Sequence, residues 1–176
     1  MREIEHRRHS WREPPGQHLT QKGVDLARRV GETMGRFDVV VTSDLPRAFE
    51  TAIAMGYAVD RQEALLSHDG GIGDEADWTL GCAEFARAFP LGKRVTEACR
   101  AHADLVRTIA RTLPADGRAL LVSHGGIIEQ GVVGLIPEFA FESWGLAFER
   151  CEGVRLVFDG DRCAGAEPLR LPSGWQ

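Results

Sequence analysis

The sequence lacks the features that define several large classes of protein. It has four cysteines in 176 residues, none in a CxxC pair, and Cys99 and His102 are two isolated ligands that cannot close a tetrahedral metal site. A disulfide scaffold and a zinc ribbon are therefore not indicated. No run approaches the ~18 apolar residues of a membrane span, and the charged first six residues contain no apolar signal segment. We expect a cytoplasmic protein with no membrane partner and no bound metal.

Positive charge is not in excess either. The chain has 21 Lys and Arg against 26 Asp and Glu, which gives a formal net charge of −5. Such a chain has no overall attraction to nucleic acid, although the balance leaves room for a local basic pocket. The 43% hydrophobic and 27% charged residues are typical of a folded domain and exclude a disordered chain. Because neither repeats nor linker-like stretches occur, we expect residues 1–176 to form a single domain.

Strand-like and helix-like segments alternate along the chain. Thr20 can cap a helix that runs to about residue 35, and Ser43 or Asp44 can cap the next one. The remaining expectations are helices over about 45–55, 94–113 and 127–136, and strands over 37–42, 57–59, 119–122, 144–150 and 154–158, the last two antiparallel and separated by a turn at Gly153. This alternation predicts a three-layer α/β/α sandwich with a mainly parallel central sheet. Ligands of such folds bind at the carboxyl ends of the strands, and the Gly- and Asp-rich loop over 67–78 is a candidate rim.

Three segments place unusual residues just after expected strands. Arg8-His9 stands at the end of the opening segment of the chain, which we expect to be a strand. Arg47 and His124 lie near the starts of two expected helices. Guanidinium groups bind phosphate oxygens with planar forks, and helix N-termini add favourable backbone donors. A neutral imidazole can attack phosphorus, while a second, protonated histidine and the arginines stabilise the phosphoryl oxygens. The pattern therefore predicts phosphoryl transfer that requires no metal or other cofactor.

Four motifs occur in order from Arg8 to Gly126. They are Arg8-His9-Ser10, Leu19-Thr20 with Gly23 and Ala27, Ser43 to Ala52 in the pattern S-x-L-x-R-A-x-x-T-A, and Leu121-Val122-Ser123-His124-Gly125-Gly126. Together they resemble the histidine phosphatase superfamily, also called phosphoglycerate mutase-like. The resemblance implies a phosphoglycerate mutase-like fold with His9 as the nucleophile. It also implies that Arg8 and Arg47 bind phosphate and that His124 is the second catalytic histidine.

The sequence departs from the family pattern beside the nucleophile. Ser10 stands where the family has Gly, and its hydroxyl could either bind the phosphate or crowd it. The segment Ile4–Arg8 is also far more polar than the apolar strand expected at the centre of such a sheet. We therefore expect this strand to be short or partly exposed.

The family's general acid, a Glu in a Leu-x-Glu setting, has no clear counterpart. Leu65-Leu66-Ser67-His68-Asp69 stands in that region, so Asp69 is the first candidate for the acid. Further candidates are Asp74, Glu75 and Asp77. Family members that cleave phosphohistidine work without this acid, so its absence also fits a phosphoramidate substrate.

The sequence is thus interpreted as a histidine acid-type phosphatase, a phosphoric monoester hydrolase that acts through a phosphohistidine. Its partner would be a small phosphorylated substrate or a phosphoprotein. The phosphoryl group would be carried as a phosphomonoester or as a phosphoramidate. The alternative is a weak or inactive family member that binds a phosphorylated ligand through the same pocket. A phosphoglycerate mutase fits less well, because the cofactor-dependent mutases are longer chains. The other histidines, His6, His18, His68 and His102, are expected to have surface or packing roles.

Overall fold

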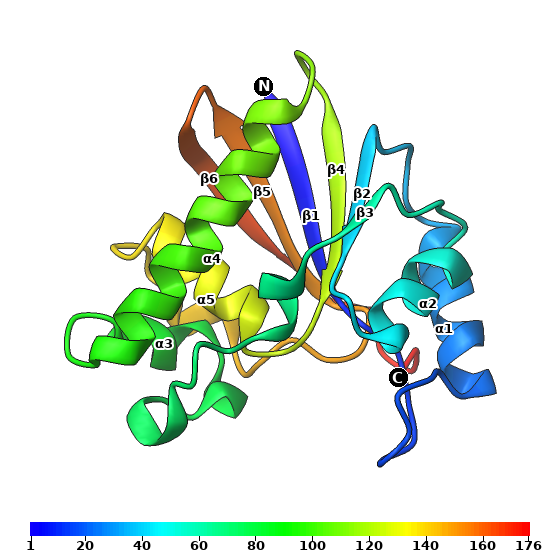
Figure 1. The fold of residues 1–176 in the computed structure, drawn as a ribbon, viewed down its shortest axis with the longest axis horizontal. Helices are drawn as coiled ribbons and strands as arrows, with labels where there is room; N and C mark the ends of the chain where they lie inside the picture. Colours follow the sequence, from blue (N-terminus) through cyan, green and yellow to red (C-terminus); the bar gives the residue numbers. More distant parts are fainter.

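The computed structural model describes all residues from Met1 to Gln176 and has one six-stranded sheet at its centre (Figure 1). The strands are β1 (Arg2–Arg8), β2 (Val39–Thr42), β3 (Arg61–Gln62), β4 (Arg118–Ser123), β5 (Gly153–Asp159) and β6 (Arg162–Leu169), in the spatial order β3-β2-β4-β1-β5-β6. The first four strands run parallel, whereas β5 pairs antiparallel with both β1 and β6. The carboxyl ends of β1, β2 and β4 therefore meet at one edge of the sheet.

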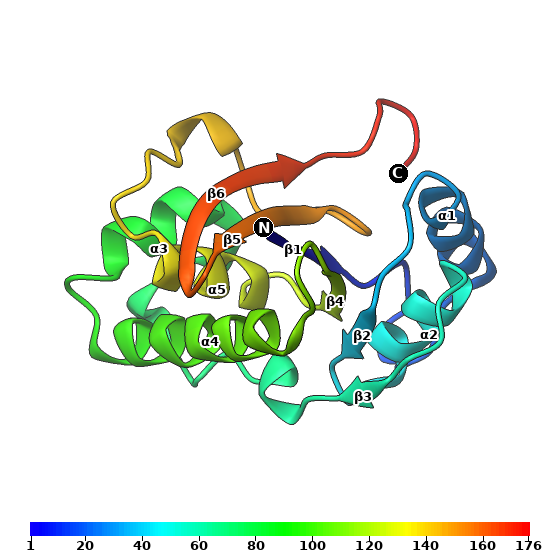
Figure 2. The same cartoon turned by 90° about the horizontal axis from the view of Figure 1, so that it is seen from above.

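Two groups of helices cover the two faces of the sheet. Figure 2 shows α1 (Gln21–Gly31) and α2 (Pro46–Ala54) on one face, and α3 (Cys82–Ala88), α4 (Lys93–Thr112) and α5 (Ile127–Leu135) on the other. Leu120 and Val122 of β4 belong to the apolar cluster that includes α1 and α2. Ala119 and Leu121 belong to the cluster with α3, α4 and α5, as alternation along a strand requires. The predicted three-layer α/β/α sandwich is confirmed. No helix combines the length and the apolar character needed to cross a bilayer.

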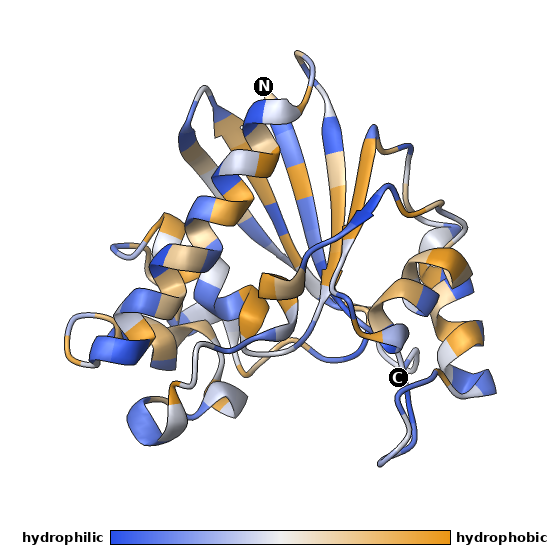
Figure 3. Cartoon of the chain, viewed as in Figure 1, coloured by the Kyte–Doolittle hydropathy of each residue, from blue (hydrophilic) through white to orange (hydrophobic).

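The polar strand β1 differs from expectation. It is seven residues long, it lies between β4 and β5, and its Glu5 and His6 are each only 1% exposed. Figure 3 shows β1 as largely hydrophilic despite its central place. Pairing explains this burial: Arg7 Nη2 donates to Glu5 Oε2 at 2.9 Å and Arg118 Nη2 to Glu5 Oε1 at 2.9 Å, while His6 Nε2 lies 2.6 Å from Ser123 Oγ. Buried charges are tolerated when opposite charges neutralise them at hydrogen-bond distance.

The caps of the first two helices differ from each other. Thr20 caps α1 as predicted, because its hydroxyl oxygen accepts a hydrogen bond from Gly23 N at 3.1 Å. Helix α2 begins at Pro46 without a side-chain cap, so the expected capping by Ser43 or Asp44 is wrong. Proline needs no partner for an N–H at this position. The Ser43 hydroxyl is consequently free to act elsewhere.

Two expected strands are wrong. Residues 57–59 are irregular, and the edge strand β3 follows them. Trp144 ends a short 3₁₀ helix and residues 145–150 form bends, a turn and irregular backbone, from which apolar side chains enter the core: the rings of Trp144 and Phe148 lie 6.2 Å apart. Gly153 starts β5 instead of forming the turn before it. The antiparallel arrangement expected for the tail is present, but as the pair β5 and β6.

Candidate active site

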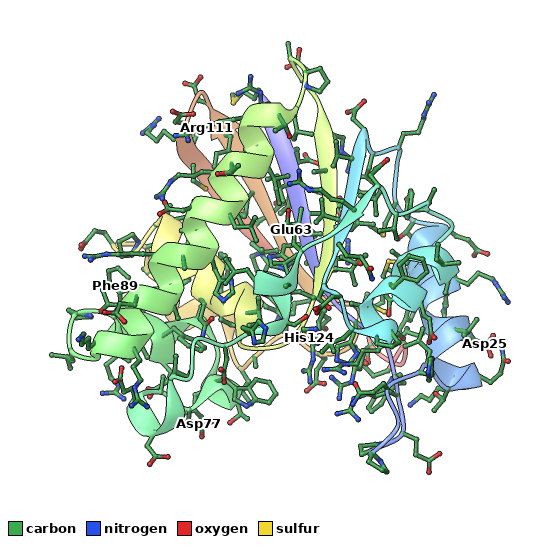
Figure 4. All side chains as sticks on the ribbon, viewed as in Figure 1. Asp25, Glu63, Asp77, Phe89, Arg111 and His124 are labelled. Carbon is green, nitrogen blue, oxygen red and sulfur yellow. The ribbon has the colours of Figure 1, made fainter.

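The expected residues converge where β1, β2 and β4 end. Figure 4 shows His124 at the lower end of the sheet, beyond the carboxyl end of β4. Its ring centroid lies 5.1 Å from that of His9, with the two rings tilted by 58°. Arg47, from the first turn of α2, places Nε 3.2 Å from His9 Nε2. The structure thus brings His9, Arg47 and His124 together from three separate segments.

The contacts of His9 assign its tautomer. Nδ1 lies 2.7 Å from the carbonyl oxygen of Ser10, which can only accept, so Nδ1 carries the proton. Nε2 receives the Nε–H of Arg47, which can only donate, so Nε2 holds a lone pair. Burial is the main cause that lowers the pKa of His9 to about 2, and His124 adds to it. His9 is therefore a neutral imidazole at pH 7, with its unprotonated nitrogen next to a guanidinium.

The family-like motifs hold the backbone around His9. Ser10 N donates to Thr51 Oγ1 at 2.9 Å, and Thr51 Oγ1 donates in turn to Arg47 O at 2.6 Å. Gly23 is required beneath this loop, because a Cβ there would lie 2.2 Å from Trp11 O. The loop after β1, the start of α1 and the first turns of α2 are therefore locked to one another.

Ser10 does not point its hydroxyl proton at the pocket. Its Oγ donates to Gly23 O at 2.7 Å, and the residue is fully buried. The extra hydroxyl thus has a hydrogen-bond acceptor on α1, which explains how a serine is accommodated in the glycine position. The two expectations for this hydroxyl, that it binds or crowds a phosphate, stay predictions.

Arg8 is enclosed on the opposite side of the pocket. It is 8% exposed, its Nη1 donates to Phe148 O at 2.7 Å, and its Nε has no partner. The Trp78 ring centroid lies 5.3 Å from the guanidinium carbon. Burial lowers the pKa of Arg8 to about 10, and the nearby charge of Arg150 contributes, so Arg8 remains a cation at neutral pH. Burial similarly lowers the pKa of Arg47.

His124 differs from expectation in its charge. Its Nε2 lies 2.8 Å from Ser43 Oγ, and its Nδ1 is enclosed without a partner. Burial lowers the pKa of His124 to about 3, and the charges of Arg47 and Arg8 act in the same direction. His124 is thus neutral at pH 7, whereas the sequence led us to expect a protonated second histidine. A bound anion offsets the two arginine charges, which favours protonation of His124.

Two further arginines belong to this positive cluster, and sequence reasoning missed both. The charges of Arg12 and Arg150 lower the pKa of Arg47, and the charge of Arg150 also lowers that of His9. Neither residue forms a salt bridge with a carboxylate. Arg12 stands three residues after His9, and that proximity was a usable signal. Arg150 lies in a tail without any motif, so only the fold reveals it.

The candidate acids lie in the loop between α2 and α3. Asp69 Oδ1 accepts from Gly71 N at 2.9 Å, Glu75 Oε2 accepts from Val95 N at 3.0 Å, and Asp77 Oδ1 accepts from Thr79 N at 3.0 Å. Asp74 is exposed. None of the four carboxylates hydrogen bonds to His9 or His124. The carboxylate whose charge raises the pKa of His124 is that of Asp44, which sequence reasoning considered only as a cap.

The loop over 67–78 borders the pocket through Trp78. A Cβ on Gly125 would lie 2.7 Å from the Trp78 ring, so the indole packs directly on the turn after His124. A cleft of about 310 Å³ opens beside Arg8, between Trp78 and Glu149. A larger groove of about 730 Å³ lies between α1 and α2, and none of the residues described at this site lines it. The small cleft shares Arg8 with the site, whereas His9, Arg47 and His124 do not line it.

Comparison with known proteins agrees with this geometry. The model of the histidine phosphatase superfamily (branch 1) matches residues 3–167. A phosphoserine phosphatase from Entamoeba histolytica, solved with 3-phosphoglyceric acid, superposes with a TM-score of 0.70 at 16% identity over 100% of both chains. A mycobacterial glucosyl-3-phosphoglycerate phosphatase gives 0.60 at 20% identity over 89% of this chain and 93% of that chain. A protein from Thermus thermophilus gives 0.60 at 22% identity over 96% of this chain and 99% of that chain. No curated protein matches the chain.

Proposed function

The chain belongs to the histidine phosphatase superfamily (branch 1), and from this membership and the site geometry we propose that it is a metal-independent phosphatase acting through a phosphohistidine. The observation that carries the proposal is the tautomer of His9, whose unprotonated Nε2 lies 3.2 Å from the Arg47 guanidinium. A nucleophile and a phosphate ligand are thereby paired at the carboxyl ends of parallel strands.

The proposed reaction has two displacements. The lone pair of His9 Nε2 attacks phosphorus, the N–P bond forms, and the bond from phosphorus to the leaving oxygen or nitrogen breaks. Water then attacks the phosphohistidine, which releases inorganic phosphate and returns the electron pair to Nε2. Arg8 and Arg47 offset the charge on the phosphoryl oxygens in both steps, and His124 donates a hydrogen bond once the anion has raised its pKa.

The leaving group needs a proton in the first displacement. We propose Asp69 as its source for a phosphomonoester, as the loop position of this carboxyl suggests. The leaving nitrogen of a phosphoramidate takes a proton from water more readily than the ester oxygen of a phosphomonoester does. A phosphoramidate therefore depends less on a general acid of the enzyme. The lack of a carboxylate in contact with either histidine makes phosphoramidates a substrate class to test alongside phosphomonoesters.

The substrate is proposed to be a small phosphorylated molecule, or a phosphoprotein that presents a phosphorylated side chain to the same cleft. The space of about 310 Å³ beside Arg8 supports a small leaving group. The names of two structural neighbours, a phosphoserine phosphatase and a glucosyl-3-phosphoglycerate phosphatase, point to small phosphomonoesters.

The test is hydrolysis of an aryl phosphate and of phosphoramidate with a chelator present. We expect phosphate release by the wild type and a loss of more than about 10³-fold in His9→Ala, because the covalent path is removed. The exposed His18 offers a matched control, and His18→Ala should keep the wild-type rate. Protein denatured with detergent at alkaline pH should carry a phosphoryl group that acid treatment removes, in the wild type only. Undiminished turnover by His9→Ala would refute the assignment of the nucleophile.

The second candidate function is phosphate binding without turnover. The neutral histidines and the arginines without a carboxylate partner can bind an anion even where no general acid completes the reaction. Tight binding of orthovanadate, together with silence on a broad panel of phosphate esters and phosphoramidate, would favour this role. Robust turnover of any one substrate would exclude it.

A further inference from the structure

Arg150 is held against the candidate phosphoryl site by the backbone of Arg8. Phe148 O accepts from Arg8 Nη1 at 2.7 Å, and Cys151 N donates to Arg8 O at 3.0 Å. Cys151 adopts a left-handed conformation with φ at +60°, which turns the chain directly after Arg150. A tail segment 140 residues away in sequence thus hydrogen bonds to both the side chain and the backbone carbonyl of Arg8.

The guanidinium of Arg150 has no partner within the protein. Its Nε and Nη1 are enclosed and form no hydrogen bond, and the group lies over the Trp11 ring at 5.2 Å from the centroid. Arg170, an arginine of the same region, shows the usual arrangement. Its guanidinium donates to Glu152 and to three backbone carbonyl oxygens. Arg150 is partly buried, and leaving its donors without acceptors is costly, which points to an acceptor that comes from outside the chain.

The position of Arg150 identifies that acceptor as the anion already proposed for the site. Its positive charge lowers the pKa values of His9, Arg8 and Arg47, the three groups expected to surround the phosphoryl group. No carboxylate neutralises any of these guanidinium groups through a salt bridge. The guanidinium groups therefore repel one another, with Glu149 as the nearby carboxylate that raises the pKa values of Arg8 and Arg150, and a bound dianion would offset two of the positive charges.

We propose that Arg150 is a third arginine ligand of the phosphoryl group, a proposal that rests on the proposed function. Its planar guanidinium fork has no acceptor within the protein and suits phosphate oxygens, and the Trp11 ring lies 5.2 Å from it. Three guanidinium groups beside two neutral histidines favour the doubly charged phosphomonoester or phosphoramidate. A phosphodiester carries one negative charge and lacks one of the terminal oxygens, so Arg150 favours the monoester class.

The test measures binding of inorganic phosphate and orthovanadate, which needs no turnover. Arg150→Met removes the charge and retains a flexible apolar stem over Trp11. We expect its Kd for phosphate to rise about 10- to 100-fold, as for loss of hydrogen bonds to a charged ligand. In the absence of an anion its melting temperature should equal or exceed that of the wild type, because repulsion is relieved. Arg29 lies over Trp175 at 3.9 Å in the same manner, and Arg29→Met should keep the wild-type Kd.

The two readouts separate a ligand role from a structural one. Unchanged phosphate affinity in Arg150→Met, with a lower melting temperature, would overturn the proposal. If Arg150→Met unfolds, Arg150→Lys decides, because it keeps the charge and the stem but loses the fork. A folded Lys variant with weaker phosphate binding supports the proposal, whereas one that binds like the wild type contradicts it.

Failure of the proposed function is recognised independently. A wild type that binds phosphate but hydrolyses nothing would refute the phosphatase proposal and leave the role of Arg150 in binding intact. Where the wild type is active, the ratio of kcat/KM for an aryl phosphate to that for its diester should fall in Arg150→Lys by about 10-fold or more. An unchanged ratio would count against Arg150 as a determinant of substrate class.

Discussion

Acidification from pH 7 to pH 5 should destabilise this protein strongly. Four histidines, His6, His9, His102 and His124, have pKa values lowered to about 3, 2, 4 and 3, in each case mainly because burial penalises the cation. Their unfolded pKa is about 6.5. Since the folded values are lower, the unfolded chain takes up protons first. The stability is therefore fully present above pH 6.5 and is lost as the pH falls toward the folded values.

The magnitude follows from the same shifts. At pH 5 each histidine favours the unfolded state by about 2 kcal/mol relative to pH 7, because the unfolded side chain is almost fully protonated and the folded one is not. The four together amount to about 8 kcal/mol, comparable to the whole free energy of unfolding of many domains. Near pH 5 the free energy of unfolding should change by about 5 kcal/mol per pH unit, which corresponds to four protons.

Urea unfolding followed by tryptophan fluorescence at several pH values measures this slope. His102→Gln should remove about one quarter of it, whatever its effect on stability at pH 7. His68→Gln, a substitution of an exposed histidine in the adjoining loop, serves as the control and should leave the slope unchanged. A free energy of unfolding that stays within about 1 kcal/mol between pH 7 and pH 5 would refute the view that these histidines are enclosed and neutral.

Three further predictions concern the contacts that hold the loop after β1 and the proposed general acid Asp69. Gly23→Ala places a methyl group 2.2 Å from Trp11 O, so it should cost about 1–3 kcal/mol in a urea titration and lower kcat; wild-type values would contradict the close packing. Thr51→Val leaves the buried Ser10 N–H without its acceptor and should cost about 1–3 kcal/mol in the same assay, unless water replaces the hydroxyl. Asp69→Asn should slow aryl phosphate hydrolysis by about 10²-fold and phosphoramidate hydrolysis far less, whereas equal losses in Asp74→Asn of the same loop would deny Asp69 a special role.

Much of the fold could be predicted because the signals are local. β-branched and apolar runs predicted the parallel strands β2 and β4, and periodic apolar positions predicted α1, α4 and α5. The helix cap at Thr20 was also predictable from the sequence, since a threonine hydroxyl at a helix start accepts a hydrogen bond from a backbone N–H within the same turn. In each case the residues that interact stand within a few positions of one another.

The wrong expectations involve partners far away in sequence. The polarity of β1 predicted partial exposure, yet Arg118 supplies the charge that buries Glu5 at the centre of the sheet. The apolar residues over 144–150 suggested a strand, but Trp144 and Phe148 fill the core from irregular backbone. Periodicity records which side chains are apolar, not which distant segment receives them.

The sequence by itself determined the family-like motifs, and with them the prediction that His9, Arg47 and His124 meet at the carboxyl ends of the strands. Only the tertiary structure decided the charge states of these groups and which residues lie next to them. Burial makes both histidines neutral, the Ser10 hydroxyl contacts α1, and the tail that carries Arg150 hydrogen bonds to Arg8 through Phe148. Desolvation and Coulomb interactions depend on distance in space, and a motif specifies only distance along the chain.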